Sequence, residues 1–518
     1  MQRAWTVADV RAAEAVRLAQ VPDGALMQRA AAGLAAVCAG VLRDVAGGVS
    51  GRRVALLVGA GNNGGDALWA GQRLARRGAR VDAVLCAGTV HAEGLAALRR
   101  AGGRVLDVSG SRAGADDADD ADDADDAAGA AGADGAAAGV LAAAHVVVDG
   151  LVGLGGSPGL RGPAAGLVAG LRPSSAGGPA VVAVDLPSGV APDSGGTPAP
   201  HVRADVTVTF GAAKPCLLLP PASRAAGRVV EVDIGLGPLL PAVAAVEGLS
   251  GADAAALWPV PGPEADKYRR GVVGVVAGSA AYPGAAVLAV AGALRAGAGM
   301  VRYLGPEHAA EHVRLQHPEA VVGEGRVQAW VVGPGVDPDA GDGQRAAAER
   351  AVRSGLPCVV DAGGLAVVPA LAGVLGPHVL LTPHAGELAR LLGALDGADR
   401  EPPREDVEAR PAEHVVRAAG LTGATVLLKG STTLVATPDG RLRAQADAPG
   451  WLATAGAGDV LAGVAGTLLA AGLDPFDAAP LAALVHGRAA ARASDGGPVT
   501  AGEVARAVPA TVADLLGG

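Results

Sequence analysis

The chain has 518 residues and a formal net charge of −10, and aromatic residues make up only 2% of it. This length exceeds what one hydrophobic core organises, so we expect two or more domains with cores packed from small aliphatic side chains. Nine of the acidic residues lie in one tract at 116–134, so the rest of the chain is nearly neutral, which argues against nucleic acid as a general partner.

The cysteines and the N-terminus indicate a reduced compartment. The four cysteines are far apart and include no CxxC pair, so they predict neither a disulfide framework nor a zinc site. Charged residues interrupt the apolar ones at the N-terminus, so no signal peptide is predicted. No uncharged apolar run of about 18 residues has the character of a membrane span. A cytoplasmic protein without a membrane partner is expected.

The first half of the chain reads as an α/β domain. Two amphipathic helices are expected within residues 1–45, the second at about 24–43. Apolar runs then alternate with helical stretches, and the expected strands are 53–59, 80–86, 145–153, 180–189 and 204–211. Continuous apolar strands separated by helices predict a parallel sheet covered on both faces, in three αβα layers.

An acidic tract interrupts this pattern at about 112–138, where ADD repeats are mixed with Ala and Gly. Carboxylates that repel one another cannot bury a core, so we expect a disordered surface insertion there. A metal-binding role for the tract is the less favoured alternative.

The second half begins a new α/β series. Residues 237–263 are rich in Pro and Ala, and we take them as the junction, with domains at 1–236 and 237–518. Strands are expected at 271–279, 300–305, 329–335, 356–364, 378–387 and 424–436. One helix is expected to end near residue 298, and two more are expected at 456–472 and 477–492. The two halves share this architecture without a convincing internal repeat.

Polar groups follow several strands of the first domain. The segment GAGNNGGDA (59–67) lies between a strand and a helix, where backbone NH groups and the helix dipole favour an anion. Asp149 and Asp185 end two further strands, so all three positions are expected to converge on one crevice. Taken singly, the glycine-rich segment is equally a structural turn, and each Asp a turn cap.

Together these segments resemble the NAD(P)H-hydrate epimerase family of the YjeF N-terminal type, across residues 1–236. Five motifs match in order, namely LMQRAAAGLA (26–35), GAGNNGGDA, VVDGLVGLG, DLPSG and TFGAAKPCLL (209–218). The resemblance implies a Rossmann-like domain that inverts C6 of a hydrated nicotinamide ring.

The resemblance also implies the site residues of this domain. The hydrated dinucleotide would bind Asn62, Asn63, Gly64, Gly65, Asp66, Gly153, Leu154, Gly155, Gly156, Ser157, Pro158, Gly159 and Asp185. A potassium ion would bind Asn63, Asp149 and Ser188, an oxygen-donor set that suits a hard monovalent cation. Asp185 is our first candidate for the catalytic acid or base and Asp66 the second, and Lys214 contributes charge. Ala67 stands where the family has Gly.

In the second domain, ATAGAGDVLAG (453–463) is a glycine-rich turn that runs into an apolar helix. Its backbone NH groups suit a transferring phosphoryl group, and Asp459 suits the base that takes a hydroxyl proton. A purely structural turn is the alternative. Its place late in an α/β domain is typical of ribokinase-like folds.

Further segments resemble the NAD(P)H-hydrate dehydratase family across about 250–515. They are 267–302, VVGPG (331–335), LLTPHAGELARLLG (380–393), VLLKGSTTLVATPDG (426–440) and ALVHGRAA (483–490). The resemblance implies that the S-hydrate contacts Ala285, Gly335, His384 and Asp459. The adenine nucleotide would bind Lys429, Gly430, Ser431, Thr432, Thr433 and Gly458.

The implied reaction transfers a phosphoryl group from ADP to the C6 hydroxyl, with Asp459 as base, and phosphate then leaves to restore NAD(P)H. Glu387 would help to place Mg²⁺, and ADP is preferred to ATP because the resemblance is to the bacterial type. The family's DADALN segment reads DAGGLA here (361–366), so Gly363 and Ala366 lack polar side chains while Asp361 is retained.

Two alternative functions are left open by the sequence. A small-molecule kinase would use the same GAGD turn, although TPHAGE and the fused first domain argue against it. The first domain would alternatively be a catalytically silent binding module, because fold alone does not establish function. We also expect a homo-oligomer.

Overall fold

The computed structural model describes residues 1–110, 124–339, 341, 343–397 and 401–517, with the backbone alone at 124–132. Internal contacts divide the chain into two compact units, Arg3–Ala245 and Val246–Gly518, and Met1–Gln2 cluster with the second. This division lies nine residues after the boundary of 236/237 drawn from the sequence. Each unit is described by itself below.

The N-terminal unit contains a parallel sheet with the strand order β4-β3-β2-β5-β6-β7-β8. Its strands are β2 (Arg53–Val58), β3 (Arg80–Leu85), β4 (Arg104–Asp107), β5 (Val146–Gly150), β6 (Ala180–Val184), β7 (Val206–Phe210) and β8 (Arg228–Val232). The edge strands β4 and β8 were not predicted. Both are partly exposed, so they lack the continuous apolar run that marks a buried parallel strand.

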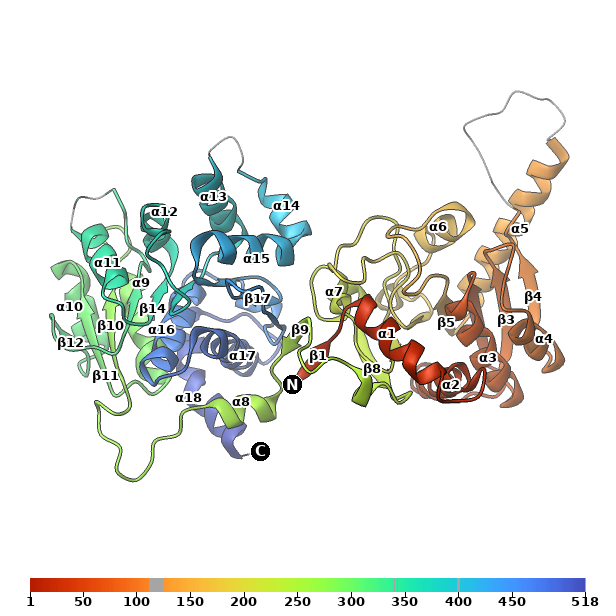
Figure 1. The fold of residues 1–518 in the computed structure, drawn as a ribbon, viewed down its shortest axis with the longest axis horizontal. Coiled ribbons are helices and arrows are strands. Elements are labelled where there is room, and N and C mark those ends of the chain that lie inside the picture. The colour runs from red at the N-terminus through yellow and green to blue at the C-terminus, as the bar shows by residue number, and fades with distance from the viewer. Residues whose placement is uncertain (111–123, 340, 342, 398–400, 518) are drawn as a thin grey trace. The chain divides into compact units, whose positions relative to one another are not determined.

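Helices cover both faces of this sheet in three layers, and Figure 1 shows α6 above and α2 below it. Helices α1 (Val7–Leu18), α2 (Ala25–Ala46), α3 (Asn62–Arg76) and α4 (Ala92–Arg100) share a core with Leu56 of β2. Helices α5 (Ala124–Ala143) and α6 (Gly162–Ala169) share another core with Leu57. Neighbouring residues of one strand therefore pack against helices on opposite faces of the sheet. The short helix α7 (Ala222–Ala226) packs beside the 186–190 segment.

The disorder expected over 112–138 is wrong for its C-terminal part. Residues 111–123 lie outside the described chain, but the backbone from 124 onward is helical in α5. Ala137 and Leu141 are buried in the core beneath that helix. The physical reason is composition, because the tract gives way to Ala-rich sequence with high helix propensity and small side chains that pack closely.

Helix α2 is long and apolar enough to cross a membrane, with a mean hydropathy of 1.6 over its best window, and half of that window is buried inside the unit. Leu34, Cys38 and Leu42 of α2 have no exposed surface and pack in the sheet core. Core helices of soluble proteins commonly have this character, so the length and hydropathy of α2 carry little weight.

In the C-terminal unit, the described residues form ten sheet strands in the order β9-β18-β17-β16-β15-β14-β13-β10-β11-β12. They are β9 (Val246–Gly248), β10 (Val272–Val276), β11 (Met300–Leu304), β12 (Val321–Val322), β13 (Ala329–Val332), β14 (Cys358–Val360), β15 (Val379–Leu381), β16 (Thr425–Leu428), β17 (Thr433–Ala436) and β18 (Leu442–Gln445). Strand β1 (Gln2–Ala4) contains residues of both units. The single strand expected at 424–436 is a hairpin, because β16 and β17 pair antiparallel. The Gly-containing turn between them reverses the chain.

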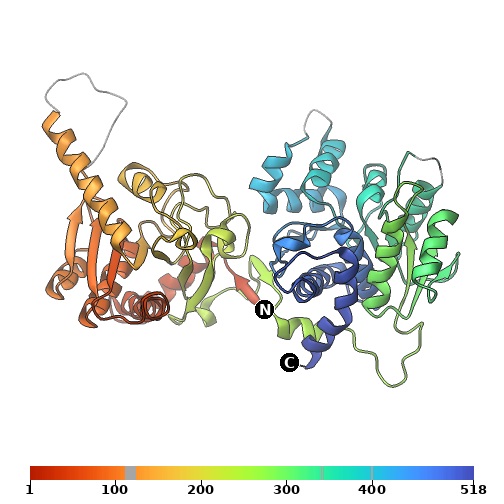
Figure 2. The ribbon, with the colours of Figure 1, turned by 180° about the vertical axis from the view of Figure 1, so that it is seen from behind.

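Most helices of this unit pack on one face of the sheet (Figure 2). They are α8 (Gly251–Leu257), α9 (Pro283–Arg295), α10 (Glu307–Gln316), α16 (Ala457–Ala470), α17 (Pro475–Ser494) and α18 (Ala501–Gly517). The others are α11 (Gln344–Arg353), α12 (Val368–Leu371), α13 (Ala385–Asp396), α14 (Arg404–Ala409) and α15 (Pro411–Thr422). Helix α11 contacts β13, and α15 contacts β16 and β17.

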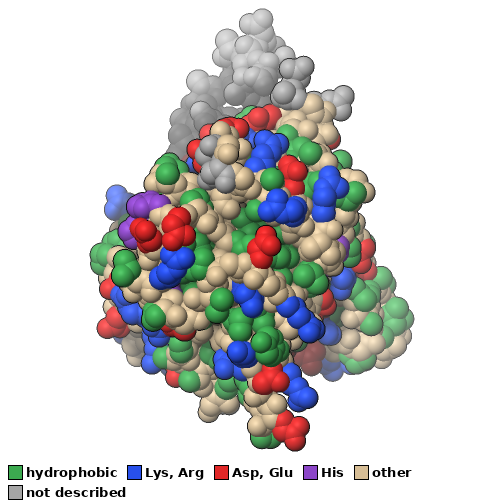
Figure 3. All heavy atoms as spheres, turned by 90° about the vertical axis from the view of Figure 1, so that its left-hand side faces the viewer, with side chains coloured by type: hydrophobic (Ala, Val, Ile, Leu, Met, Phe, Trp, Pro, Cys, Tyr) green, Lys and Arg blue, Asp and Glu red, His purple; other side chains and the backbone are tan. Residues whose placement is uncertain are grey.

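The face seen in Figure 3 carries basic and acidic side chains interspersed.

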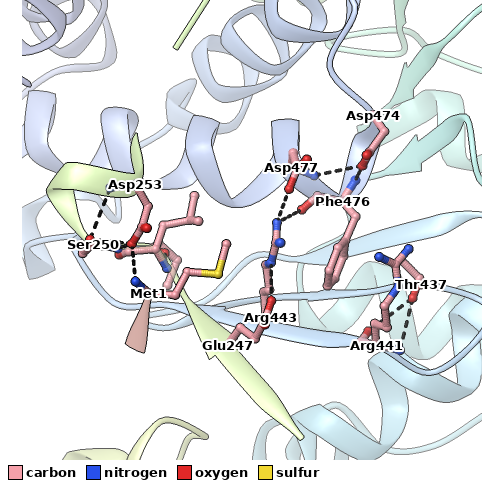
Figure 4. Close-up of polar contacts among 12 residues, drawn as sticks. Met1, Glu247, Ser250, Asp253, Thr437, Arg441, Arg443, Asp474, Phe476 and Asp477 are labelled. Carbon is pink, nitrogen blue, oxygen red and sulfur yellow. Dashed lines mark hydrogen bonds and ion pairs between the residues drawn. The ribbon is translucent and has the colours of Figure 1, made fainter. Parts of the chain in front are cut away.

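A buried arginine anchors the antiparallel end of the sheet, as Figure 4 shows. Arg443 of β18 pairs with Glu247 of β9 at 3.3 Å and with Asp477 of α17 at 2.6 Å. Its guanidinium also lies 4.1 Å from the ring centroid of Phe476. Asp253 of α8 pairs with the amino group of Met1 at 2.7 Å. Charge neutralisation by several partners makes this burial of Arg443 tolerable.

Candidate active sites

The first turn of α3 is shaped for an anion. Gly61 precedes the helix with a φ of 80°, a conformation that favours glycine. A Cβ on Gly64 would overlap the carbonyl oxygen of Gly59, so the turn closes tightly only without a side chain there. The free NH groups of the first turn therefore face the end of the sheet, where the helix dipole favours negative charge.

A cavity of about 710 Å³ opens beside this turn. The predicted substrate residues that line it are Asn62, Asn63, Asp66, Gly153, Leu154, Gly155, Gly156, Ser157, Gly159 and Asp185. Gly64, Gly65 and Pro158 are not among its lining residues. The structure thus brings the ends of β2, β5 and β6 together around one space, while the two glycines serve the packing of α3.

Asp185 is held by a buried ion pair at the end of β6. Its carboxylate Oδ1 is bonded by Lys214 Nζ, and Lys214 itself is only 1% exposed. The Oδ1 atom also accepts hydrogen bonds from Thr209 Oγ1 at 3.2 Å and from the Phe210 amide at 3.3 Å. The backbone of Asp185 has a φ of 67°, which is strained for a residue with a side chain. Such strain is typical of functional sites.

Two further carboxyl groups line the same cavity, and neither has a hydrogen-bond or ion-pair partner among the described residues. The Oδ1 atom of Asp66 is buried and has no hydrogen-bond partner among the described residues. Burial first, and then the charges of Asp185 and Glu14, raise the pKa of Asp66 well above its usual range. Glu14 of α1 lines the cavity as well, and sequence reasoning missed it because no strand-end motif contains it.

The predicted potassium ligands lie together beneath the cavity. Asp149 and Ser188 are fully buried, and Ser188 Oγ donates to Asp149 Oδ1 at 2.6 Å. The amide nitrogen of Asn63 donates to the Val184 carbonyl at 2.8 Å, which leaves its oxygen free for another partner. In the described part of the chain, no basic side chain pairs with Asp149. The donor set is made of oxygens and has one uncompensated carboxylate, so it fits a monovalent cation.

The departure at Ala67 is accommodated by a neighbouring glycine. Ala67 is fully buried, and a Cβ on Gly150 would lie 2.6 Å from its methyl carbon. The missing side chain of Gly150 therefore provides the space that the Ala67 methyl group occupies.

In the C-terminal unit, Asp459 lies in the first turn of α16, directly after the GAGD turn. Gly456 precedes the helix with a φ of 83°, and Ala457 and Gly458 open it. Burial, followed by the negative charge of Asp361, raises the pKa of Asp459 to about 7. A carboxyl group poised near neutrality is well matched to accept a hydroxyl proton.

Lys429 faces the same turn from the end of β16. Its Nζ lies 2.6 Å from Asp361 Oδ1 and 3.6 Å from Glu387 Oε2. Asp361 is buried and also accepts a hydrogen bond from Thr382 at 2.8 Å. A Cβ on Gly458 would lie 3.5 Å from Lys429 Nζ and 3.8 Å from Asp361 Oδ2. Asp361 and Thr382 thus belong to the site, although the sequence analysis gave neither of them a role. The Asp361 retained in the DAGGLA segment could have indicated it.

His384 caps helix α13 beside Lys429. Its Nδ1 accepts hydrogen bonds from the amides of Gly386 at 3.1 Å and Glu387 at 3.2 Å. The Lys429 amide donates to the Pro383 carbonyl at 2.8 Å, which joins the two segments. The other ring nitrogen, Nε2, lies 3.6 Å from Glu387 Oε1, and half of the side chain is exposed.

The remaining predicted contacts lie on neighbouring loops. A Cβ on Gly335 would lie 2.5 Å from Cβ of Ala285, so these two residues are adjacent. A Cβ on Gly363 would overlap the Val336 carbonyl oxygen, so the loop that follows Gly335 packs directly against the altered DAGGLA segment. Ala366 is exposed. The missing side chain at 363 is thus replaced by backbone rather than by an empty space.

The glycine at 458 allows a test of the nucleotide site that the resemblance implies. We expect Gly458→Ala to raise the KM for ADP by about tenfold, because its methyl group enters the space between the helix end and Lys429. Steady-state kinetics with varied ADP would measure this. Gly502→Ala, at a helical glycine whose nearest neighbour to a Cβ is an Arg506 nitrogen at 3.7 Å, is the control. An unchanged KM in Gly458→Ala would contradict the assignment.

Two family models match the chain. The model described as YjeF-related protein N-terminus matches residues 23–216, and the model described as NAD(P)H-hydrate dehydratase matches residues 273–508. The first range lies within the N-terminal unit and the second within the C-terminal unit. These matches confirm the two predicted α/β domains and the two families that their motifs resemble.

Relatives of the chain are found over nearly its whole length and over each half. The bifunctional NAD(P)H-hydrate repair enzyme Nnr of Mycobacterium leprae is 44% identical over 511 residues, 96% of each chain. The NAD(P)H-hydrate epimerase of Clavibacter michiganensis subsp. michiganensis is 44% identical over 237 residues, which cover 45% of this chain and 90% of that protein. A crystal structure of the ADP/ATP-dependent NAD(P)H-hydrate dehydratase from Bacillus subtilis, co-crystallized with ATP/Mg²⁺, shares 26% identity at a TM-score of 0.46, covering 52% of this chain and 99% of that one. The chain therefore belongs to the family of bifunctional NAD(P)H-hydrate repair enzymes.

Proposed function

We propose that the 710 Å³ cavity epimerises R- and S-NAD(P)H hydrates and that the Asp459 site dehydrates the S form with ADP, giving NAD(P)H, AMP and phosphate. The observation that carries the proposal is the convergence of Lys429, Asp361 and Gly458 beside the base Asp459. The epimerase activity is assigned to a separate cavity, which Asp185 and Asp66 line. Fusion is functionally sensible, because an S-specific repair step uses only part of an R/S mixture unless the R form is converted.

In the epimerase cavity, Asp66 and Asp185 have different surroundings. The Asp185 carboxylate is ion-paired with Lys214, and we assign it as the base. Burial and negative neighbours raise the pKa of Asp66 and favour its neutral form, so we assign Asp66 as the acid. A carboxylate in an ion pair and a buried carboxyl group without such a partner suit acid–base catalysis at one ring carbon.

A potassium ion is proposed for the oxygen set of Asn63, Asp149 and Ser188. When bound, the cation would neutralise Asp149 and supply positive charge near the dinucleotide. The chain's own contribution is rigidity, since Ser188 also accepts a hydrogen bond from the Val152 amide at 2.9 Å and so anchors the start of the 153–159 loop.

We expect epimerisation to fall about tenfold when K⁺ is replaced by tetramethylammonium, because a large cation cannot enter a buried oxygen site. The melting temperature of the N-terminal unit should rise with K⁺ concentration, since a ligand bound only by the folded state stabilises it. Asp149→Asn should lose both responses. If the melting temperature of the unaltered enzyme did not respond to K⁺ either, the proposed potassium site would be contradicted.

In the C-terminal site, Asp459 takes the C6 hydroxyl proton as the oxygen attacks the terminal phosphorus of ADP. Lys429 and the NH groups at the start of α16 stabilise the charge on the transferred group. Phosphate then leaves C6 more readily than hydroxide would, and loss of a proton from C5 forms the C5–C6 double bond of the dihydronicotinamide ring. Mg²⁺, held by Glu387 and nucleotide phosphates, would supply further charge neutralisation, in keeping with a cation that binds few protein carboxylates.

The decisive experiment supplies a racemic hydrate mixture with ADP or ATP in turn and follows the dihydronicotinamide absorbance. Complete recovery of the absorbance requires both activities, and recovery that stops near half requires the dehydratase alone. Faster recovery with ADP supports the proposed co-substrate. Absence of recovery, with phosphorylation of another alcohol, would establish a small-molecule kinase instead.

A further inference from the structure

Helix α1 contributes a carboxyl group, Glu14, to the wall of the epimerase cavity. The helix is tied to two loops, of which the one that contains Leu154 lines the cavity. Arg11 Nη2 donates to the Leu154 carbonyl at 3.0 Å, and the Val7 amide donates to Asp193 Oδ1 at 2.8 Å. The Glu14 side chain is therefore held over the cavity by a fixed element rather than by a free N-terminal arm.

The charges around Glu14 leave it free to exchange a proton. Glu14 has no hydrogen bond or ion pair in the part of the chain that the structure describes. The ammonium group of Lys214 is engaged by Asp185, and the Arg11 guanidinium donates to a backbone carbonyl. Burial raises the pKa of Glu14; the charges of Lys214 and Arg11 lower it, and that of Asp185 raises it. Asp66 of α3 is the fourth charged neighbour.

The stereochemistry of the reaction requires more than one such group. In the hydrate, C6 carries the hydroxyl and is bonded to N1. A base takes the hydroxyl proton, the C6–N1 electron pair moves to N1, and N1 takes a proton from an acid, leaving a C6 aldehyde. Closure on the other face of the aldehyde reverses these transfers. With the rest of the ring held in place, the hydroxyl lies on opposite faces in the two epimers, so one fixed carboxyl group cannot serve it in both.

We propose that Glu14 is a catalytic residue of the epimerase, which exchanges the hydroxyl proton on one ring face while Asp185 does so on the other. Asp66 then serves N1. This inference rests on the proposed function of the cavity and assigns it a third carboxyl group, contributed by a different element: Glu14 comes from α1, whereas Asp185 follows β6 and Asp66 lies in α3.

The test starts from pure R-hydrate without ADP, so that the dehydratase site is idle, and follows the S-hydrate by chromatography across pH. We expect Glu14→Gln to lower kcat by about 10²-fold, with a KM within a few-fold of the unaltered enzyme. One limb of the pH profile should disappear, and Glu14→Asp should restore part of the rate.

Asp44→Asn on α2, an exposed carboxylate away from the cavity, is the matched control and should leave the rate unchanged. The dehydratase rate of each variant with S-hydrate and ADP normalises the amount of folded enzyme. A Glu14→Gln variant with the unaltered rate and pH profile would overturn the proposal, as would a rise in KM alone. Absence of R/S interconversion in the unaltered enzyme would instead overturn the epimerase assignment of the cavity.

Discussion

Asp459→Asn should lower the dehydratase rate by about 10³-fold while the epimerase rate stays unchanged. The amide keeps the shape of the side chain but cannot accept the hydroxyl proton. In the unaltered enzyme the ionised carboxylate is the active form, and burial together with Asp361 raises the pKa of Asp459 to about 7. The rate should therefore fall as the pH drops below about 7 and reach a plateau above it. Recovery of dihydronicotinamide absorbance from S-hydrate and ADP measures both effects.

Asp361→Asn tests the cause of that pH dependence. Removing the negative charge of Asp361 takes away one contribution that raises the pKa of Asp459, and it frees the positive charge of Lys429, which lowers the same pKa. The acidic limb should therefore move to lower pH. A limb that stays in place in Asp361→Asn, or a normal rate in Asp459→Asn, would contradict the assigned base.

Asp185→Asn should lower epimerisation by about 10²–10³-fold and also destabilise the N-terminal unit by about 3–5 kcal/mol. The loss of stability follows because Lys214 is 1% exposed and would keep a buried charge without its partner. Hydrogen exchange of peptides from the N-terminal unit measures the stability separately from that of the C-terminal unit.

The double variant Asp185→Asn/Lys214→Met separates the two effects. It removes both charges and keeps an apolar side chain in place of the buried lysine, so stability should largely return while epimerisation stays low. Recovery of epimerisation in the double variant would show that Asp185 serves only to compensate Lys214. Asp82→Asn, which breaks an exposed pair with Arg104, should change stability little.

Sequence patterns determined the buried part of both sheets and the strand ends that carry polar groups. Strands β2, β5 and β6 were predicted because their apolar runs are continuous, and the C-terminal ends of neighbouring parallel strands lie at the same edge of a sheet. Strands β4, β8, β12 and β18 were not predicted, since short or partly polar segments gain their strand conformation from pairing with a neighbour.

The sequence by itself therefore predicted the two-domain α/β organisation. It also singled out Asp459, Asp149 and Asp185 as candidate site residues, because each follows a strand or opens a helix. Only the tertiary structure decided which distant groups act on them. Lys214 meets Asp185 across 29 positions of sequence, and Asp361 meets Lys429 across 68. Glu14 reaches the cavity from a helix far from every strand-end motif. The physical reason is that proton affinity depends on burial and on charges nearby in space, which local sequence patterns do not report.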